Sequence, residues 1–332
     1  MKSRRIVSPM ARGSGAYIVH RLLELHLQQY QLISYNPYLT LLPFLLPVAA
    51  SSKGAKLIHT TPDYASFFYQ KSVPLLITFQ NYVLDPWMRS YSSWAQRIHY
   101  ASDLRLWTKL AIKKAHTITA VSQSTAKLVQ QDMGITCPIK IITNFVDANC
   151  FTPGRPSAAD RKEVRIFFSG NLTIRKGSQW LPSIAKQLGK NTCIYYTQGL
   201  RTRRTLPFSP NMKSIGPVPY EEMPNRYQEM DILLMPTVRE GFSLSVLEAM
   251  ASGLPVVASD CSSLPEQIDN GNGGFLCPVG DVNAFAEKIN FLADSPKLRR
   301  EMGEYNRAKV EKMFTLDRMI KEYQELFEVV LG

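Results

Sequence analysis

Short apolar runs alternate with amphipathic stretches along the first half of the chain. The runs lie at residues 5–9, 31–35, 56–59, 74–79, 116–121 and 139–142. Residues 16–27, after the loop Gly13-Ser14-Gly15, space their apolar positions as a helix does, and helical stretches separate most of the other runs. Strands that alternate with helices form parallel sheets covered on both faces. The pattern predicts a doubly wound α/β domain.

A second domain is predicted after a segment of turn-forming residues that runs from Thr143 to Pro156. Strands are then expected at residues 164–169, 191–196, 214–216, 231–236 and 255–259, with helices at residues 179–188 and 245–251 between them. This is a second doubly wound sheet. We therefore expect an N-terminal domain over residues 1–150 and a C-terminal domain over residues 151–314.

The chain ends in an amphipathic pattern. Residues 315–332 place Met319, Tyr323, Leu326 and Val330 at helical spacing. The apolar face of such a helix needs a surface to cover it. We expect this helix to pack back on the N-terminal domain.

Two doubly wound domains in tandem also predict where a ligand binds. Parallel sheets of this kind bind ligands outside the carboxyl ends of their strands. When two such domains face each other, those ends lie on either side of the cleft between them. The expected active site is that cleft.

The composition agrees with two folded domains. The chain has 332 residues, of which 45% are apolar and 20% charged, so it is long enough for two cores and does not resemble a disordered chain. Its five cysteines are odd in number and widely spaced, which fits a reducing compartment. The longest apolar run, Leu41 to Ala50, contains two prolines and is about half as long as a membrane span. We expect a cytoplasmic protein.

The positive charge is concentrated in the first half. The net charge is +12, and residues 1–150 carry +10 of it, from 16 basic and 6 acidic residues. Such a field attracts an anionic lipid surface, a phosphorylated acceptor or a nucleic acid. Three tryptophans lie among basic residues between Tyr82 and Lys114: Trp87, Trp94 and Trp107 beside Arg89, Arg97, Arg105, Lys109, Lys113 and Lys114. This segment fits either a peripheral contact with the inner face of a membrane or a solvated helix surface.

Two carboxylates flank a loop that opens a predicted helix. Glu240 precedes Gly241-Phe242-Ser243-Leu244, and Glu248 lies inside the helix that follows. Amides at a helix N-terminus bind phosphate groups, and a glycine lets the backbone approach a ligand closely. The spacing predicts that Gly241, Phe242, Ser243 and Leu244 contact a nucleotide sugar whose diphosphate lies at the helix start. Glu248 would then lie near a ribose hydroxyl, and Glu240 would face the sugar. Two glutamates at this interval also fit a solvated helix surface.

The stretch from Gly216 to Ser259 resembles the family-4 retaining glycosyltransferases nearly residue for residue, with Glu240 and Glu248 as the paired-glutamate motif of that family. Weaker similarities span the chain, at residues 13–15, 120–126, 143–147 and 272–276. The resemblance implies the GT-B fold, in which two Rossmann-like domains face each other across a cleft. It also implies retaining transfer of a hexose-type sugar from a UDP- or GDP-sugar to a glycan, lipid-linked or cell-envelope polysaccharide acceptor.

The resemblance further assigns site residues. A basic loop of the family holds the donor diphosphate and corresponds to Lys176 and, with a shifted position, Arg175. Fixed cations there would stabilise the charge that grows on the leaving group. Gly15 corresponds to the first glycine loop of the donor site. Gln80 stands where the family has a histidine, and a glutamine cannot take a proton.

Other roles and functions stay open. His59 and His99 are the nearby alternatives for a base, and each also fits a structural role. The chain has no Asp-x-Asp pair, so we expect neither a metal nor another cofactor, and the family implies front-face substitution. A sugar-nucleotide epimerase or phosphorylase of the same fold, or a non-catalytic module that binds a membrane or a nucleic acid, are the other candidates. The intact motif favours the transferase, and no nucleic acid partner is expected.

Overall fold

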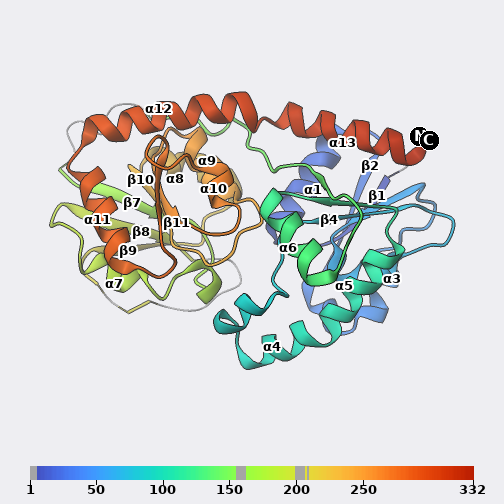
Figure 1. Ribbon diagram of the computed structural model, residues 1–332. Helices are drawn as coiled ribbons and strands as arrows, with labels where there is room; N and C mark the ends of the chain where they lie inside the picture. Colours follow the sequence, from blue (N-terminus) through green and yellow to red (C-terminus); the bar gives the residue numbers. More distant parts are fainter. Residues whose placement is uncertain (1–5, 155–161, 199–205, 208) are drawn as a thin grey trace. The chain divides into compact units, whose positions relative to one another are not determined.

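The computed structural model describes residues 6–154, 162–198, 206–207 and 209–332 (Figure 1). The chain divides into two compact units, one of residues 1–144 with 317–332 and the other of residues 145–316. We call them unit 1 and unit 2. Two ends of predicted segments, Arg5 of the first strand and Pro156 of the linker, lie outside the described residues.

Unit 1 contains a six-stranded sheet in which every neighbouring pair is parallel. The strand order is β2-β1-β3-β4-β5-β6. The strands are β1 (Ile6–Ala11), β2 (Tyr30–Tyr35), β3 (Leu57–Thr60), β4 (Leu75–Phe79), β5 (Thr117–Ala120) and β6 (Lys140–Ile141). Each overlaps one of the apolar runs from which it was predicted, because short buried runs bounded by turn residues favour parallel strands.

Helices cover both faces of this sheet (Figure 1). They are α1 (Gly15–His26), α2 (Leu46–Ala49), α3 (Ala65–Phe68), α4 (Trp94–Ala101), α5 (Asp103–Lys114), α6 (Gln123–Met133) and α13 (Leu316–Leu331). Single 3₁₀ turns join them: η1 (Pro37–Leu41), η2 (Pro43–Leu45), η3 (Pro62–Tyr64) and η4 (Pro86–Tyr91). A proline begins each of these turns, where its fixed φ is already helical.

Strand β4 shows how alternating side chains divide the core of unit 1. Leu75, Ile77 and Phe79 point into an apolar cluster that includes residues of α3, α5 and α6. Thr78 points to the other face, where its hydroxyl lies 2.8 Å from Nε2 of His59. Helix α13 packs over that face, and the ring of Phe327 lies 5.6 Å from the His59 ring, centroid to centroid.

Unit 2 contains a second six-stranded sheet, also with parallel neighbours throughout. Its order is β12-β11-β10-β7-β8-β9. The strands are β7 (Val164–Phe168), β8 (Thr192–Thr197), β9 (Met212–Gly216), β10 (Ile232–Met235), β11 (Val256–Ser259) and β12 (Gly274–Cys277). The sequence did not indicate β12 as a strand, because its four residues begin with glycine and include no β-branched side chain.

The helices of unit 2 pack on both faces of its sheet (Figure 1). They are α7 (Leu181–Ala185), α8 (Met223–Gln228), α9 (Leu244–Ala251), α10 (Leu264–Gln267), α11 (Val282–Ala293) and α12 (Pro296–Met313), with 3₁₀ turns η6 (Ile174–Lys176) and η7 (Tyr220–Glu222). Adjacent residues of β7 face opposite sides. Phe168 lies in an apolar cluster with Ile184 and Ile289, and Phe167 packs against Tyr227 with ring centroids 5.1 Å apart.

The strand order of unit 2 reverses between β7 and β10. The chain proceeds from β7 to β8 on one side of the sheet and later from β10 to β11 on the other. Loops that leave two such strands diverge and open a crevice at their carboxyl ends. The loop after β7 carries Arg175 and Lys176, and the loop after β10 carries Glu240, so the fold itself brings the predicted basic loop to the first motif glutamate.

Within the described residues, no helix is both long enough and apolar enough to cross a bilayer. The apolar run Leu41 to Ala50 forms the turn η2 and the short helix α2 instead.

Candidate active site

Three charged side chains meet where β7 and β10 end. Nζ of Lys176 lies 2.9 Å from Oε1 of Glu240, and Nη1 of Arg175 lies 3.4 Å from the same oxygen. Burial opposes ionisation of Glu240, but the charges of Lys176 and Arg175 outweigh it and hold the pKa of Glu240 below its ordinary value. Glu240 is therefore an ionised carboxylate at neutral pH.

Contacts between the two loops hold these side chains in place. Oγ1 of Thr237 lies 2.9 Å from Oε1 of Glu240 and 2.8 Å from the carbonyl oxygen of Arg175. Nη1 of Arg175 donates to the carbonyl oxygen of Arg239 at 2.8 Å, and the amide of Val238 donates to the Arg175 carbonyl oxygen at 2.9 Å. Charges fixed in this way need little reorganisation when a ligand develops charge beside them.

Gly177 allows the loop after β7 to approach β10. Its φ is +76°, in the left-handed region that favours glycine. A Cβ atom at this position would overlap the carbonyl oxygen of Pro236, which directly follows β10. The hydroxyl of Thr173 accepts the Lys176 amide at 3.3 Å and caps the turn η6. The close approach of the two loops therefore requires glycine at residue 177.

Glu248 lies inside α9 with 6% of its surface exposed. The hydroxyl of Tyr227 donates to its Oε2 at 2.8 Å. Burial raises the pKa of Glu248 to about 7, although Tyr227 and the nearby charge of Lys176 both favour its ionised form. A carboxyl group that titrates near neutrality can either accept or donate a hydrogen bond to a ligand hydroxyl.

The loop between the two glutamates positions the start of α9. Ser243 caps the helix by accepting the Val246 amide at 3.4 Å. Its own amide donates to Oε1 of Gln267 at 2.8 Å, and Nε2 of Gln267 donates to its carbonyl oxygen at 2.9 Å. The half-buried residue Leu244 begins the first turn, whose amides have no acceptor inside a helix. This is the arrangement expected of an anion-binding helix start.

Phe242, which was predicted as a donor contact, contributes its side chain to the core. The side chain is buried, and its ring packs against Phe314 with centroids 5.3 Å apart. Only the backbone of Phe242 is left to face a ligand. Gly241 is also buried in the same loop.

The sequence did not indicate several residues that support Glu240. Ser262 has a φ of +48°, which is uncommon for a residue other than glycine, and its hydroxyl accepts the Glu240 amide at 2.9 Å. The hydroxyl of Ser263 donates to the Glu240 carbonyl oxygen at 3.4 Å. These serines follow β11, far along the chain from Glu240. Thr237 is the second residue after the strand β10, and that position is the only feature of the sequence that could have indicated it.

Two predicted site residues, Gly15 and Gln80, belong to unit 1. Gly15 is the first residue of α1 after its cap Ser14, which accepts the Tyr17 amide at 3.0 Å. Gln80 directly follows β4. Both therefore lie at the carboxyl edge of the unit 1 sheet. Nε2 of Gln80 is buried, and within the part of the chain that the structure describes it donates to no acceptor.

The two histidines considered as alternative bases have structural partners. His59 is fully buried, with Nδ1 2.8 Å from the Tyr30 hydroxyl and Nε2 2.8 Å from that of Thr78, and burial lowers its pKa well below the ordinary value. His99 pairs with Asp103 one turn later on the surface, at 2.9 Å. His59 therefore belongs to the core of unit 1, and His99 is held by Asp103 at the surface.

No group of three or more His, Cys, Asp or Glu side chains among the described residues is arranged to hold a metal ion. The charged centre of unit 2 consists instead of two cations around one carboxylate.

Comparisons with known proteins identify the family. Residues 155–309 match the family model of glycosyl transferases group 1, and residues 5–149 match that of glycosyltransferase family 4. Together the two matches span both units. The chain belongs to the family-4 glycosyltransferases.

Two relatives of this glycosyltransferase differ in the specificity that their names state. It is 28% identical to the D-inositol 3-phosphate glycosyltransferase of Corynebacterium jeikeium (strain K411) over 63% of this chain and 57% of that protein. It is 26% identical to the sulfoquinovosyl transferase SQD2 of Arabidopsis thaliana over 73% of this chain and 49% of that protein. The chain thus spans about half the length of these relatives.

Solved structures show that the glycosyltransferase has the GT-B fold. Sucrose-phosphate synthase from Thermosynechococcus elongatus matches with a TM-score of 0.85 at 18% identity, covering 98% of this chain and 99% of that one. Anabaena Alr3699/HepE in complex with UDP-glucose matches with a TM-score of 0.78 at 18% identity, over the same shares. Both matches extend over nearly the whole chain, as the sequence resemblance implied.

Proposed function

We propose that the chain is a retaining glycosyltransferase that moves a hexose-type sugar from a UDP- or GDP-sugar to a glycan, lipid-linked or cell-envelope polysaccharide acceptor. The ion cluster of Glu240, Lys176 and Arg175 at the crevice of unit 2 carries this proposal. Two structures similar to this chain, of Anabaena Alr3699/HepE, are complexes with UDP-glucose and with UDP, which supports a nucleotide-sugar donor and UDP in particular.

The charges of the cluster suit a diphosphate. One carboxylate shares two cations, so the cluster keeps a positive charge that a donor diphosphate would neutralise. The first-turn amides of α9 would face the same group. Glu240 then orients the transferred sugar, and Glu248 contacts a ribose hydroxyl. Nε2 of Gln80, a buried donor, would find its acceptor on the sugar or on the reaction centre.

The same cations make a metal unnecessary. As the bond between the anomeric carbon and the diphosphate oxygen breaks, negative charge grows on the diphosphate beside Lys176 and Arg175. The acceptor hydroxyl bonds to the anomeric carbon on the face that the diphosphate leaves, and its proton passes to the departing phosphate oxygen. The configuration at the anomeric carbon is thereby kept, and no cofactor takes part.

Product analysis tests the proposal. The chain is incubated with UDP- and GDP-sugars, with and without a lipid or glycan acceptor and with and without EDTA, and released nucleotide and the first product are measured by chromatography and proton NMR. We expect acceptor-dependent nucleotide release that survives EDTA and a product with the anomeric configuration of the donor. Nucleotide release without an acceptor would favour the hydrolysing epimerase, and an inverted product would contradict the retaining mechanism.

We also propose that unit 1 holds the enzyme on the inner, anionic face of the cytoplasmic membrane. The segment from η1 to α2 has no charged residue, and six of its apolar side chains are 38–84% exposed: Tyr38, Leu41, Leu42, Phe44, Leu45 and Val48. Exposed apolar residues in such density mark an interaction surface. Unit 1 has a net charge of +9, from 18 basic and 9 acidic residues, so it attracts anionic lipid and repels a second copy of itself.

This surface differs from the one expected between Tyr82 and Lys114. There the ring of Trp107 packs edge-on against Phe67 with centroids 4.8 Å apart, and Lys114 lies over the Tyr69 ring at 4.9 Å. Trp107 and Lys114 therefore serve packing within unit 1, whereas Trp87 and Trp94 of the same segment are exposed. All five cysteines, each within the described residues, are free thiols, which supports a reducing compartment.

Cosedimentation with vesicles tests the attachment. The triple variant Leu41→Ser, Phe44→Ser and Val48→Ser should lose binding to phosphatidylglycerol-containing vesicles, because its apolar contacts with the acyl boundary are gone. Leu25→Ser, at an exposed leucine of α1, is the matched control and should bind as the unchanged chain does. Equal binding by both variants would exclude this surface.

A further inference from the structure

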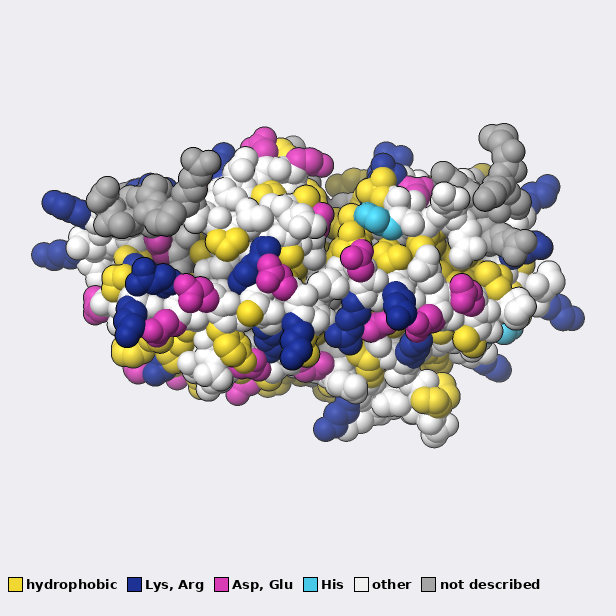
Figure 2. Space-filling model, turned by 90° about the horizontal axis from the view of Figure 1, so that it is seen from above, with side chains coloured by type: hydrophobic (Ala, Val, Ile, Leu, Met, Phe, Trp, Pro, Cys, Tyr) yellow, Lys and Arg dark blue, Asp and Glu magenta, His cyan; other side chains and the backbone are white. Residues whose placement is uncertain are grey.

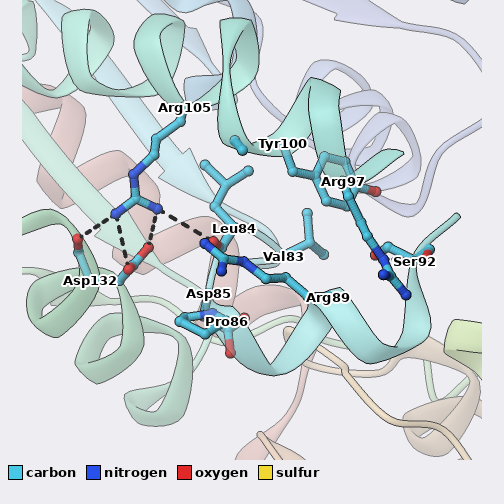
Figure 3. Close-up of a pocket in the computed structure, with 11 residues that line it drawn as sticks. Val83, Leu84, Asp85, Pro86, Arg89, Ser92, Arg97, Tyr100, Arg105 and Asp132 are labelled. Carbon is cyan, nitrogen blue, oxygen red and sulfur yellow. Dashed lines mark hydrogen bonds and ion pairs between the residues drawn. The ribbon is translucent and has the colours of Figure 1, made fainter. Parts of the chain in front are cut away.

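A pocket of about 460 Å³ lies within unit 1, away from the residues assigned above (Figure 3). Its walls come from the segment after β4, the turn η4, the helix α4, the first turn of α5 and the end of α6. Pockets of about 300–1,000 Å³ hold small molecules, so this one has room for more than a bare ion.

One wall of the pocket is fixed by a fork of hydrogen bonds. Arg105 donates to the two carboxylate oxygens of Asp132 at 2.8 and 3.0 Å, and to the Asp132 carbonyl oxygen at 3.0 Å. The hydroxyl of Tyr82 donates to the same carboxylate. The Arg105–Asp132 pair therefore ties α5 to α6, and its charges satisfy each other (Figure 3). Arg105 is a positioning residue of this wall.

The other two arginines of the pocket keep donors available. Among the described residues, no carboxylate lies within ion-pair distance of Arg89 or Arg97. Nε of Arg97 donates to the carbonyl oxygen of Ser92 at 3.1 Å, which orients its guanidinium and leaves both terminal nitrogens for a ligand. Arg89 extends from η4 and Arg97 from α4, on different sides of the pocket (Figure 3). With Asp85 as the remaining carboxylate, the lining has a net positive charge.

The same two elements carry exposed apolar side chains. Trp87 on η4 is 49% exposed, and Trp94 and Ile98 on α4 are 77% and 48% exposed. Trp94 and Ile98 lie one turn apart and share a helix face. Tryptophan beside arginine suits the boundary between a lipid headgroup and its acyl chains, where the ring is half buried and the charge meets phosphate.

We propose that this pocket binds the phosphate group of a lipid-borne acceptor, with Arg89 and Arg97 as the phosphate-binding residues and Trp87, Trp94 and Ile98 against the lipid chain. A guanidinium group can donate two parallel hydrogen bonds to the oxygens of one phosphate, so two arginines in a pocket favour a phosphate as the ligand. The inference rests on the proposed transfer to an acceptor. It adds a second anion site, in unit 1, to the donor diphosphate site in unit 2.

Titration calorimetry with a short-chain lipid phosphate tests the pocket. The probe is dihexanoyl phosphatidic acid, used below the concentration at which it forms micelles, and the comparison ligands are inorganic phosphate and dihexanoyl phosphatidylcholine. The variant Arg89→Gln/Arg97→Gln removes the two free cations. The variant Lys53→Gln/Lys56→Gln removes the same charge from exposed positions of unit 1 outside the pocket.

We expect the unchanged chain to bind dihexanoyl phosphatidic acid more tightly than either comparison ligand. The arginine variant should lose at least about tenfold in affinity, because each hydrogen bond to a charged group contributes about that factor, and the lysine variant should lose little. Equal affinity for inorganic phosphate would show that a soluble phosphorylated acceptor is the source of the group and overturn the lipid assignment. Equal losses of affinity in the arginine and lysine variants would show that the pocket does not bind the phosphate.

A nucleotide titration of the same samples separates this inference from the proposed function. The arginine variant should bind UDP or GDP as the unchanged chain does, because its two substitutions lie in unit 1 and the diphosphate residues lie in unit 2. If the unchanged chain binds no nucleotide, the proposed function is wrong. The lipid-phosphate titration still tests the pocket in that case, because it does not depend on a nucleotide.

Discussion

Nζ of Lys176 lies 2.9 Å from Oε1 of Glu240, with the two side chains 13% and 8% exposed. The residues come from loops that follow β7 and β10, the two strands between which the order of the unit 2 sheet reverses. A buried ion pair at such a point costs desolvation free energy, and removing one partner leaves the other charge uncompensated. Because the pair lies at the edge of the sheet where such folds bind ligands, we infer that it serves ligand binding rather than the stability of the fold.

Replacement of Glu240 by Gln should separate transfer from nucleotide binding. The amide keeps the shape but loses the charge that orients the sugar, so we expect transfer to fall by about a hundredfold or more and nucleotide affinity to change by only a few-fold. Turnover and calorimetry on the same preparation measure both. If Glu240→Gln instead binds the nucleotide much more weakly but keeps its turnover at saturating donor, Glu240 contacts the nucleotide and not the sugar.

Replacement of Lys176 by Met should lower turnover by about a hundredfold, because a fixed cation beside the departing diphosphate is lost. It should also raise the pKa of Glu240, since the first of its two cationic neighbours is gone. Lys186→Met, at an exposed lysine just after α7, is the charge-matched control. Steady-state kinetics against pH distinguish the two variants, and similar losses in both would contradict a specific role for Lys176.

Nucleotide affinity should depend on pH through Glu248. The pKa of Glu248 is raised by burial to about 7, so the carboxylate that accepts a ribose hydroxyl forms as the pH rises through that value. We expect UDP or GDP to bind more tightly above about pH 7 than below it, and Glu248→Ala to bind weakly at every pH. Calorimetry across this range checks the trend. A pH dependence that persists in Glu248→Ala would assign it to another group.

Unit 1 should lose stability in mild acid. Burial lowers the pKa of His20 to about 3 and that of His59 well below its ordinary value of 6.5. A histidine with a lowered pKa in the folded state takes up its proton only on unfolding, so its contribution is complete above pH 6.5 and falls as the pH drops. We expect a loss of about 2 kcal/mol at about pH 5 from His20 alone.

Urea unfolding at several pH values measures this loss. His26→Asn, at an exposed histidine of α1, should unfold with the same pH dependence as the unchanged chain. The double variant His20→Asn/His59→Asn should show a smaller slope. A slope that is unaffected by the double variant would mean that other groups control acid unfolding.

Replacement of Gly177 by Ala should damage the site through the backbone. Both Gly177 and Gly271 have positive φ, so alanine costs about 1–2 kcal/mol at either position. At Gly177 the Cβ would also overlap the carbonyl oxygen of Pro236, whereas at Gly271 it meets open space. We therefore expect Gly177→Ala to lower the free energy of unfolding of unit 2 more than Gly271→Ala and to weaken nucleotide binding. Equal effects would contradict the close approach of the two loops.

The sequence by itself determined the class of fold and the family. Short runs such as residues 74–79 are buried on both faces of a parallel sheet, so their continuous apolar character identifies them without knowledge of the partner strands. The candidate site residues Glu240, Glu248 and Lys176 were predicted from the resemblance of their segments to the family, because their spacing alone also fits a solvated surface. These signals are local, and local signals can be read along the chain.

Only the tertiary structure decided which residues meet. Ser262, which accepts the Glu240 amide, follows β11. Thr237 donates to the carbonyl oxygen of Arg175, in the loop after β7. These contacts form because parallel strands bring distant loops to one edge of a sheet. The histidines illustrate the same limit. His59 could have been a base, but the strand pairing places it among Tyr30, Thr78 and Phe327, where burial keeps it neutral. Burial and partners depend on the whole fold, so no local pattern reveals them.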